Sequence, residues 1–148
     1  MANPFTYDIQ QAGYGFDQVD AKGEATFEVF AAEFRKFPWK DQVGLKTGGS
    51  EPTISVKNTA ASFDCWVSVL GTSEDLAYLV GIVYPERVRR FFGLGPEKEV
   101  RWLSANIVED PRDVESLFQL HFASKFDELK SALGRYPRFL SQAARQPG

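Results

Sequence analysis

Between Thr26 and about Phe37, apolar side chains recur at the spacing of an amphipathic helix. Residues three, four and seven positions apart share one face of a helix, so these side chains form a single apolar stripe. Pro38 disfavours helical geometry for the residue before it, and we therefore expect the helix to end at about Phe37. The stripe consists of Phe27, Phe30, Ala31, Phe34 and Phe37.

Four later segments show patterns that are typical of strands. Side chains alternate between two faces over 53–58, 63–70 and 100–108. The run 76–84 is apolar on both of its faces, which predicts a central strand with something covering each face. Pro85 is expected to stop this strand. The short polar turns between segments predict an antiparallel four-stranded meander.

The start and the end of a long C-terminal helix are marked in the sequence. Asp110 is a favourable N-cap, Pro111 suits the first helical position, and Asp113 lies where the helix dipole favours a negative charge. Gly134 is expected to adopt the left-handed conformation that closes many helices. The apolar stripe between these signals consists of Val114, Leu117, Phe118, Phe122, Phe126, Leu129 and Leu133.

These segments together predict an α+β fold, in which an N-terminal helix and a long C-terminal helix pack on the four-stranded meander. The length of 148 residues suits a single domain. Residues 1–23 carry aromatic side chains without a sustained period, and we expect a loosely structured arm there. The α+β core is expected to span 24–140, followed by a frayed tail over 141–148.

The charge of the chain argues against nucleic acid as a partner. Seventeen Lys and Arg residues against twenty Asp and Glu residues give a net charge of −3. A protein that holds phosphate backbones is usually basic. The balance is uneven, because residues 1–34 contain six acidic residues and a single basic one, Lys22. We interpret this excess either as a solvated surface or as an acidic face that meets a basic partner.

The sequence also predicts where the protein is found. No apolar run approaches the roughly 20 residues that a membrane-spanning helix needs, so we expect no membrane partner. The start of the chain lacks the basic flank and apolar stretch of a signal peptide. Cys65 is the only cysteine, so the chain forms no internal disulfide. We therefore expect a cytoplasmic protein.

Candidate catalytic residues are few. His121 is the only histidine, and a serine or cysteine nucleophile would need it as a base. It lies at the border of the apolar stripe of the last helix, which is typical of a histidine at the edge of a core. Cys65 lies within a strand among apolar neighbours and is expected to be buried and unreactive. Nucleotide, phosphate and metal motifs are missing, so we expect no enzymatic activity, no cofactor and no metal.

Lys125 leaves a second interpretation open. It falls within the apolar stripe of the last helix, where either its ammonium reaches solvent past a packed stem, or it borders a cleft and meets a carboxylate. The corresponding alternative is a small-molecule-binding domain or an unrecognised enzyme with a pocket between sheet and helices. The expected lining of that pocket is Tyr78, Trp102, His121 and Lys125.

The segment between Pro85 and Lys98 combines Arg with aromatic residues. It forms either a hairpin that folds onto the core or a recognition surface, because Arg and aromatic side chains dominate binding hot spots. Exposed acids near the sheet complete the second interpretation. The expected partner-binding residues are Asp64, Glu74, Asp75, Arg87, Arg89, Arg90, Phe91 and Phe92. A monomer and a homodimer are both compatible with this surface.

Strands and aromatic residues have a recognisable arrangement in four segments: 37–42 (FPWKDQ), 52–58 (PTISVKN), 66–69 (WVSV) and 78–85 (YLVGIVYP). This arrangement is similar to that of bacterial immunity proteins, which are encoded beside polymorphic or contact-delivered toxins. The resemblance carries no functional residue over to a position of this chain. It implies a non-enzymatic cytoplasmic inhibitor that binds one toxin domain, often by covering a basic active site with acidic surface.

Overall fold

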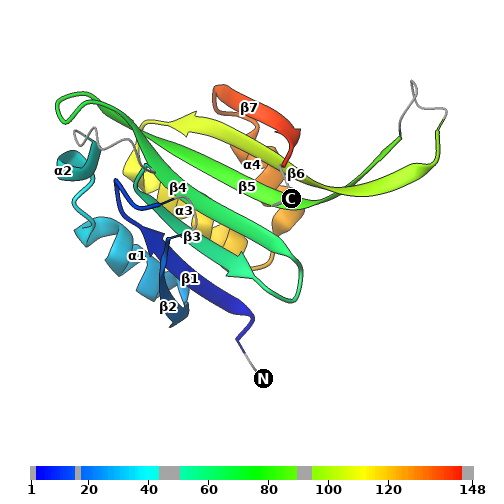
Figure 1. The fold of residues 1–148 in the computed structure, drawn as a ribbon, viewed down its shortest axis with the longest axis horizontal. Helices are drawn as coiled ribbons and strands as arrows, with labels where there is room; N and C mark the ends of the chain where they lie inside the picture. Colours follow the sequence, from blue (N-terminus) through cyan, green and yellow to red (C-terminus); the bar gives the residue numbers. More distant parts are fainter. Residues whose placement is uncertain (1–2, 16–17, 44–50, 90–94, 145–148) are drawn as a thin grey trace.

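The computed structural model describes residues 3–15, 18–43, 51–89 and 95–144. Within them, seven strands form one antiparallel sheet in the order β2-β1-β3-β4-β5-β6-β7 (Figure 1). The strands are β1 (Phe5–Gln10), β2 (Asp20–Glu24), β3 (Thr53–Asn58), β4 (Phe63–Gly71), β5 (Leu76–Arg89), β6 (Glu97–Val108) and β7 (Arg138–Ala143). The helices are α1 (Phe27–Lys36), α2 (Trp39–Val43), α3 (Pro111–Phe122) and α4 (Phe126–Leu133).

The helices α1, α3 and α4 lie on one face of the sheet, and no described helix or strand covers the other face (Figure 1). The covered face carries Val56 and Val80, which are fully buried. Phe30 of α1 stacks on Phe118 of α3 with 3.9 Å between ring centroids, which joins the two helices over the sheet. The α+β class predicted from the sequence is therefore confirmed.

The predicted four-stranded meander is incomplete. The sheet has three further strands, of which β1 and β2 come from the start of the chain and β7 comes from its end. Residues 1–23, expected to be loosely structured, provide β1 and all of β2 except its last residue, Glu24. In β1 the side chains of Phe5, Tyr7 and Ile9 point into the core, and the strand pairs along its whole length with β3. β7 spans Arg138–Ala143, so the tail expected from residue 141 begins inside a strand.

Both long helices begin where the sequence predicts. The Thr26 hydroxyl accepts a hydrogen bond from the Val29 N–H at 3.2 Å, at the start of α1. The Asp110 carboxylate accepts one from the Arg112 N–H at 2.8 Å, at the start of α3. Each bond satisfies a backbone donor that has no partner within its helix.

The prediction of one long C-terminal helix is wrong, because the chain forms two helices, α3 and α4, in its place. Ser124, between them, has a left-handed φ of 57°. The Lys125 N–H donates to the Leu120 carbonyl at 2.9 Å, and the Ser124 N–H donates to the His121 carbonyl at 3.0 Å. These two bonds close α3 in a Schellman motif, so Ser124 has the role that the sequence assigned to Gly134. Gly134 itself is right-handed, with a φ of −64°.

β5 and β6 extend past their neighbours as a two-stranded ribbon, which we call the arm and define as residues 86–89 and 97–100. Pairing between β4 and β5 ends at Asp64 opposite Val83. Pairing between β5 and β6 continues to Arg89 opposite Glu97. Figure 1 shows the arm projecting away from the rest of the sheet.

Pro85 does not stop β5, contrary to the sequence prediction, and the hydrogen-bond pattern explains why. Pro85 lies opposite Arg101, whose carbonyl accepts a hydrogen bond from the Ala144 N–H on the β7 side. In an antiparallel ladder Pro85 and Arg101 therefore form a pair without hydrogen bonds between them. The nitrogen of Pro85 faces the edge beyond the end of β4, where a missing N–H costs no ladder bond.

Candidate functional site

The uncovered side of the sheet, which we call the open face, has an apolar centre. The strand register places one row of side chains from β4, β5, β6 and β7 on this face. Most of the apolar side chains in this row are partly exposed. Leu79 and Ala105 lie between them on the same face and are almost fully buried. The apolar centre consists of Trp66, Leu70, Val83, Leu103, Ile107 and Leu140.

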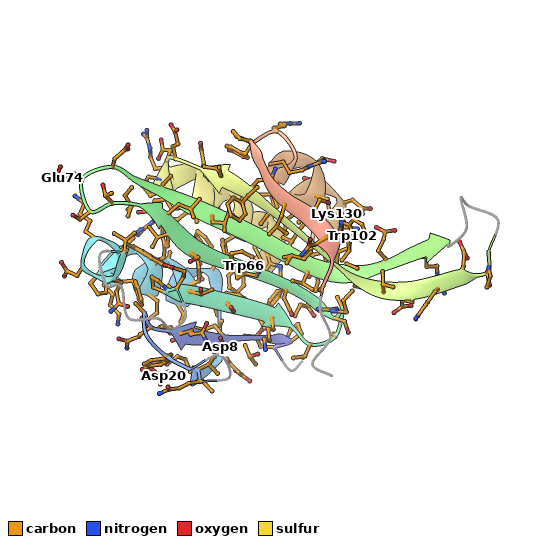
Figure 2. All side chains as sticks on the ribbon, turned by 45° about the horizontal axis from the view of Figure 1, so that its top comes forward. Asp8, Asp20, Trp66, Glu74, Trp102 and Lys130 are labelled. Atoms are coloured by element: carbon orange, nitrogen blue, oxygen red, sulfur yellow. The ribbon has the colours of Figure 1, made fainter. Side chains whose placement is uncertain are left out.

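Trp66 lies near the middle of the open face (Figure 2). It is opposite Gly81 on β5, and a Cβ added to Gly81 would overlap the indole ring. The ring therefore lies directly over the backbone of β5, in a position that only a residue without a side chain permits. The indole remains partly exposed on the open face.

Four alternating charges cross the open face beside the apolar centre, and we call them the charged row: Asp8, Lys57, Asp64 and Arg101. The Lys57 ammonium lies 3.8 Å from an Asp8 carboxylate oxygen. The Arg101 guanidinium lies 3.1 Å from an Asp64 carboxylate oxygen. Arg101 also donates to the carbonyl of Ser62.

Burial affects both carboxyl groups of the charged row. Burial raises the pKa of Asp64 above its usual value, although Arg101 and Lys57 act in the opposite direction. Burial also raises the pKa of Asp8, against the effect of Lys57. A carboxylate that is already partly desolvated loses less hydration when a partner covers it, provided that its cation stays in contact.

The arm contributes an exposed charged ribbon next to the open face. The side chains of Glu86 and Arg87 on one strand and of Glu97 and Lys98 on the other are exposed. Arg87 lies 3.7 Å from Glu97, which joins the two strands. A two-stranded ribbon without a third strand is only marginally stable in water, so contact with a partner would stabilise it.

The predicted partner-binding residues fall into three places. Asp64 belongs to the charged row, and Arg87 lies on the arm. Glu74 and Asp75 are exposed in the turn between β4 and β5, at the opposite end of the sheet from the arm (Figure 2). Arg89 is the last residue of β5, and its side chain is not described. The remaining predicted residues lie outside the described part of the chain: Arg90, Phe91 and Phe92.

His121, the candidate base, is fully buried. Its Nε2 lies 3.0 Å from the carbonyl oxygen of Val56 and donates to it, because a carbonyl can only accept. Its Nδ1 has no hydrogen-bond partner. The rings of Phe5 and Phe63 lie within 6 Å of the imidazole, at centroid distances of 5.3 and 5.7 Å. Burial lowers its pKa from 6.5 to about 4. His121 is therefore a core residue, and no substrate reaches it in this conformation.

The other three predicted pocket residues have separate surroundings. Tyr78 packs against Phe34, with 5.3 Å between ring centroids, and burial raises its pKa. Trp102 donates from its indole nitrogen to the Ser141 hydroxyl at 2.9 Å. Lys125 precedes the first residue of α4 and is exposed, so it does not belong to an apolar stripe. The structure does not bring these residues together into a pocket.

Hollows in the described structure are shallow or small. One of about 300 Å³ lies between β1 and α1, with Asp20, Lys22, Glu33 and Lys36 at its rim. A second, of about 400 Å³, lies on the outer side of α3 and α4. The third, between the sheet and α4, measures about 120 Å³ and is lined by Tyr84, Ser104, Asn106, Lys130, Leu133 and Arg138, among others. The first and the third of these hollows lie between the sheet and a helix, where the alternative function placed its pocket, but neither is lined by the residues predicted for that pocket.

Cys65 is fully buried, as expected, and burial raises the pKa of its thiol well above the usual value. The described residues contain no group of three His, Cys, Asp or Glu side chains placed to hold a metal ion. Among the helices that the structure describes, none has the length and apolar character needed to cross a bilayer.

No protein-family model matches the chain, and no curated protein or solved structure shows significant similarity to it. The resemblance to immunity proteins therefore stays a prediction, and the candidate site depends on the geometry described above.

The sequence predicted the apolar character of the open face but not its exposure. The run 76–84 predicts a strand that is covered on both faces, but the described structure covers only one of them. Leu103 and Ile107 of β6 share this uncovered side. The sequence signal was correct about the apolar character of this face, but no described helix or strand supplies the cover that it predicted.

Proposed function

We propose that this protein is a non-enzymatic binding protein that neutralises a bacterial toxin by covering the toxin's active site with its open face. The observation that carries the proposal is the apolar centre, which no described helix or strand covers. A central strand with two apolar faces needs a cover on each of them, because exposed contiguous apolar surface is unfavourable in water. The described chain supplies one cover, and the partner would supply the other.

The composition of the open face supports a protein as the partner. Binding energy at protein interfaces concentrates in a few desolvated aromatic and Arg side chains, which charged groups surround at the rim. Trp66 lies in the apolar centre, and Arg101 lies beside it in the charged row. The arm next to this surface is suited to enter a cleft, because it projects beyond the sheet.

Charge supports a toxin whose active-site cleft is basic. The net charge is −3. Acidic side chains gather on β1, β2 and the first turn of α1, where Lys22 is the one basic residue: Asp8, Asp20, Glu24 and Glu28. Opposite charges on two partners accelerate their encounter, and buried apolar contacts slow their dissociation.

The alternative, a small-molecule-binding domain or an enzyme with a pocket between sheet and helices, has less support. Binding pockets for small molecules usually enclose about 300–1,000 Å³. The hollow between the sheet and α4 measures about 120 Å³. The hollow between β1 and α1 measures about 300 Å³, the lower end of that range, and none of the four predicted pocket residues lines either hollow. Elsewhere the interface is filled, for example by the stacked rings of Phe30 and Phe118.

The test needs a candidate toxin, which the gene immediately upstream of this one should encode. Co-expression of the two proteins should restore growth of bacteria that the toxin alone arrests. Leu103→Lys places a charge in the apolar centre and should weaken binding by about 30-fold or more, the effect expected at an interface hot spot. Gln119→Lys is the matched control, because Gln119 is exposed on α3, on the helix side of the sheet and outside the acidic group.

Binding is measured by calorimetry with the purified proteins, after circular dichroism has shown that both variants are folded. A toxin that the wild-type protein does not bind or neutralise would contradict the proposal. So would equal affinities for the wild type and Leu103→Lys. Turnover of a substrate by this protein alone would support the alternative.

A further inference from the structure

The two edges of the sheet differ in how they are protected against pairing with another strand. β2 is one edge, and three of its five residues are charged: Asp20, Lys22 and Glu24. Charged side chains on an edge strand discourage a further strand from adding to it. β7 is the other edge, with the sequence RFLSQA, and Arg138 at its first position is its one charged residue. The β7 edge therefore lacks the protection that β2 has.

The hydrogen bonds of β7 show which of its backbone groups are free. The Ala144 N–H donates to the carbonyl of Arg101, and Ala143 lies opposite Trp102. Because the two sides of an antiparallel ladder alternate along a strand, the peptide groups of Ala143 and Ser141 point away from β6. They form a row of donors and acceptors along the outer edge of the sheet.

A large apolar side chain lies on the same strand. Phe139 is 50% exposed, the highest value among the three large apolar residues that are exposed in the described part of the chain. The irregularity in the pairing of β6 with β7 falls at this residue, between Leu140 and Arg138. The stretch from Leu140 to Ala143 is regular and available for pairing.

We propose that β7 pairs with β7 of a second copy of this chain, antiparallel about a two-fold axis, to form a continuous sheet across a homodimer. With Ser141 at the axis, the outward peptide groups of the two copies face each other and exchange hydrogen bonds. Phe139 then lies opposite Ala143 of the second copy, and Arg138 lies opposite Ala144. No like charges meet in this register, so the strand is complementary to itself.

The dimer has a structural consequence. A two-fold axis perpendicular to the sheet keeps the helices of both copies on one side, so the two open faces lie side by side on the other. α4 lies behind β6 and β7 (Figure 1), so it approaches α4 of the second copy and adds to the buried area. Pairing of one short strand alone buries less than the roughly 1,200 Å² of a stable interface, so the dimer should dissociate on dilution.

The test is the mass of the wild-type chain in solution, measured by sedimentation equilibrium over about a hundredfold range of concentration. We expect the mass to rise with concentration from 16.6 kDa towards twice that value. Phe139→Lys adds a charge at the edge, and Ala143→Pro removes an outward N–H while leaving the bonds to β6 intact. Both variants should remain monomeric over the whole range.

Val29→Lys is the matched control for the dimer, because it adds the same charge at an exposed apolar residue on α1, and it should associate like the wild type. If Ala143→Pro does not fold, Phe139→Lys still tests the proposal, because it changes an exposed side chain. A wild-type chain that stays monomeric throughout would overturn the proposal. A dimer that persists in Phe139→Lys would also overturn it, and a loss of that dimer in Leu103→Lys would then identify the open face as the contact.

Discussion

Mild acid should destabilise this protein through His121. The imidazole is fully buried, and its Nδ1 has no acceptor for the proton that would charge it. In the folded state burial lowers its pKa from 6.5 to about 4. In the unfolded chain the same group takes up a proton near pH 6.5. Between about pH 6.5 and 4 the unfolded state therefore binds more protons, so the free energy of unfolding falls as the pH falls.

The size of the effect follows from the shift of the pKa. At about 1.4 kcal/mol for each unit of pKa, the change from 6.5 to about 4 corresponds to about 3 kcal/mol. This stability is fully present above pH 6.5 and is lost progressively down to about pH 4. The raised pKa values of Asp8 and Asp64 act in the opposite direction, because their folded forms hold a proton to higher pH.

His121→Gln separates the histidine from the carboxyl groups. The Gln side-chain amide can donate to the carbonyl of Val56, as His121 does, but it does not titrate. Urea unfolding, followed by tryptophan fluorescence at several pH values between about 7.5 and 4.5, gives the free energy of unfolding for both proteins. The wild type should lose stability more steeply than the variant. Parallel pH profiles would refute the argument, as would an NMR titration of the folded histidine with a pKa near 6.5.

Three further substitutions test the local structure. Gly81→Ala should cost about 1–3 kcal/mol of stability and change the fluorescence, because a Cβ there displaces the ring of Trp66; a neutral result would show that the ring does not lie over β5. Ser124→Gly should raise the melting temperature by about 2–4 °C, because glycine adopts a positive φ without strain. A decrease of the melting temperature in calorimetry would contradict this. Thr26→Ala should lower the free energy of unfolding in urea by about 1 kcal/mol, whereas Thr26→Ser keeps the hydroxyl and should retain most of this stability. Equal losses of stability in the two variants would exclude the cap as the cause.

Local signals predicted the parts of the fold that local chemistry determines. Asp110 and Pro111 mark the start of α3, because a cap depends on residues within one turn. The apolar period that begins after Thr26 marks the start of α1. The break after α3 was missed because a serine, Ser124, holds the left-handed position that glycine usually occupies. The apolar stripe continues across the break, so periodicity alone could not reveal it.

Long-range pairing determines the parts that were missed. β1 alternates over only six residues and becomes recognisable through its register with β3, which begins more than forty positions later in the chain. Pro85 interrupts the strand pattern in the sequence, yet β5 continues because the proline nitrogen faces a free edge. Neither fact is available from a window of neighbouring residues.

In the candidate site, too, some features follow from neighbouring residues and others from long-range pairing. The two apolar faces of the run 76–84 were visible in the sequence, but which face remains uncovered depends on where the helices pack. The charged row is likewise a product of register, because Asp8 and Lys57 lie on β1 and β3, and Asp64 and Arg101 on β4 and β6. Sequence reasoning selected Asp64 as an exposed acid near the sheet and could not predict its contact with Arg101.

The most direct test of the docking surface is methyl NMR of the protein bound to its candidate toxin. Methyl groups of Leu103 and Ile107 report on the open face, and those of Leu129 and Leu133 report on the buried side of α4. If the open face binds the toxin, the signals of the first pair should shift or broaden while those of the second pair stay in place. Unchanged signals from Leu103 and Ile107 in a saturated complex would contradict the account.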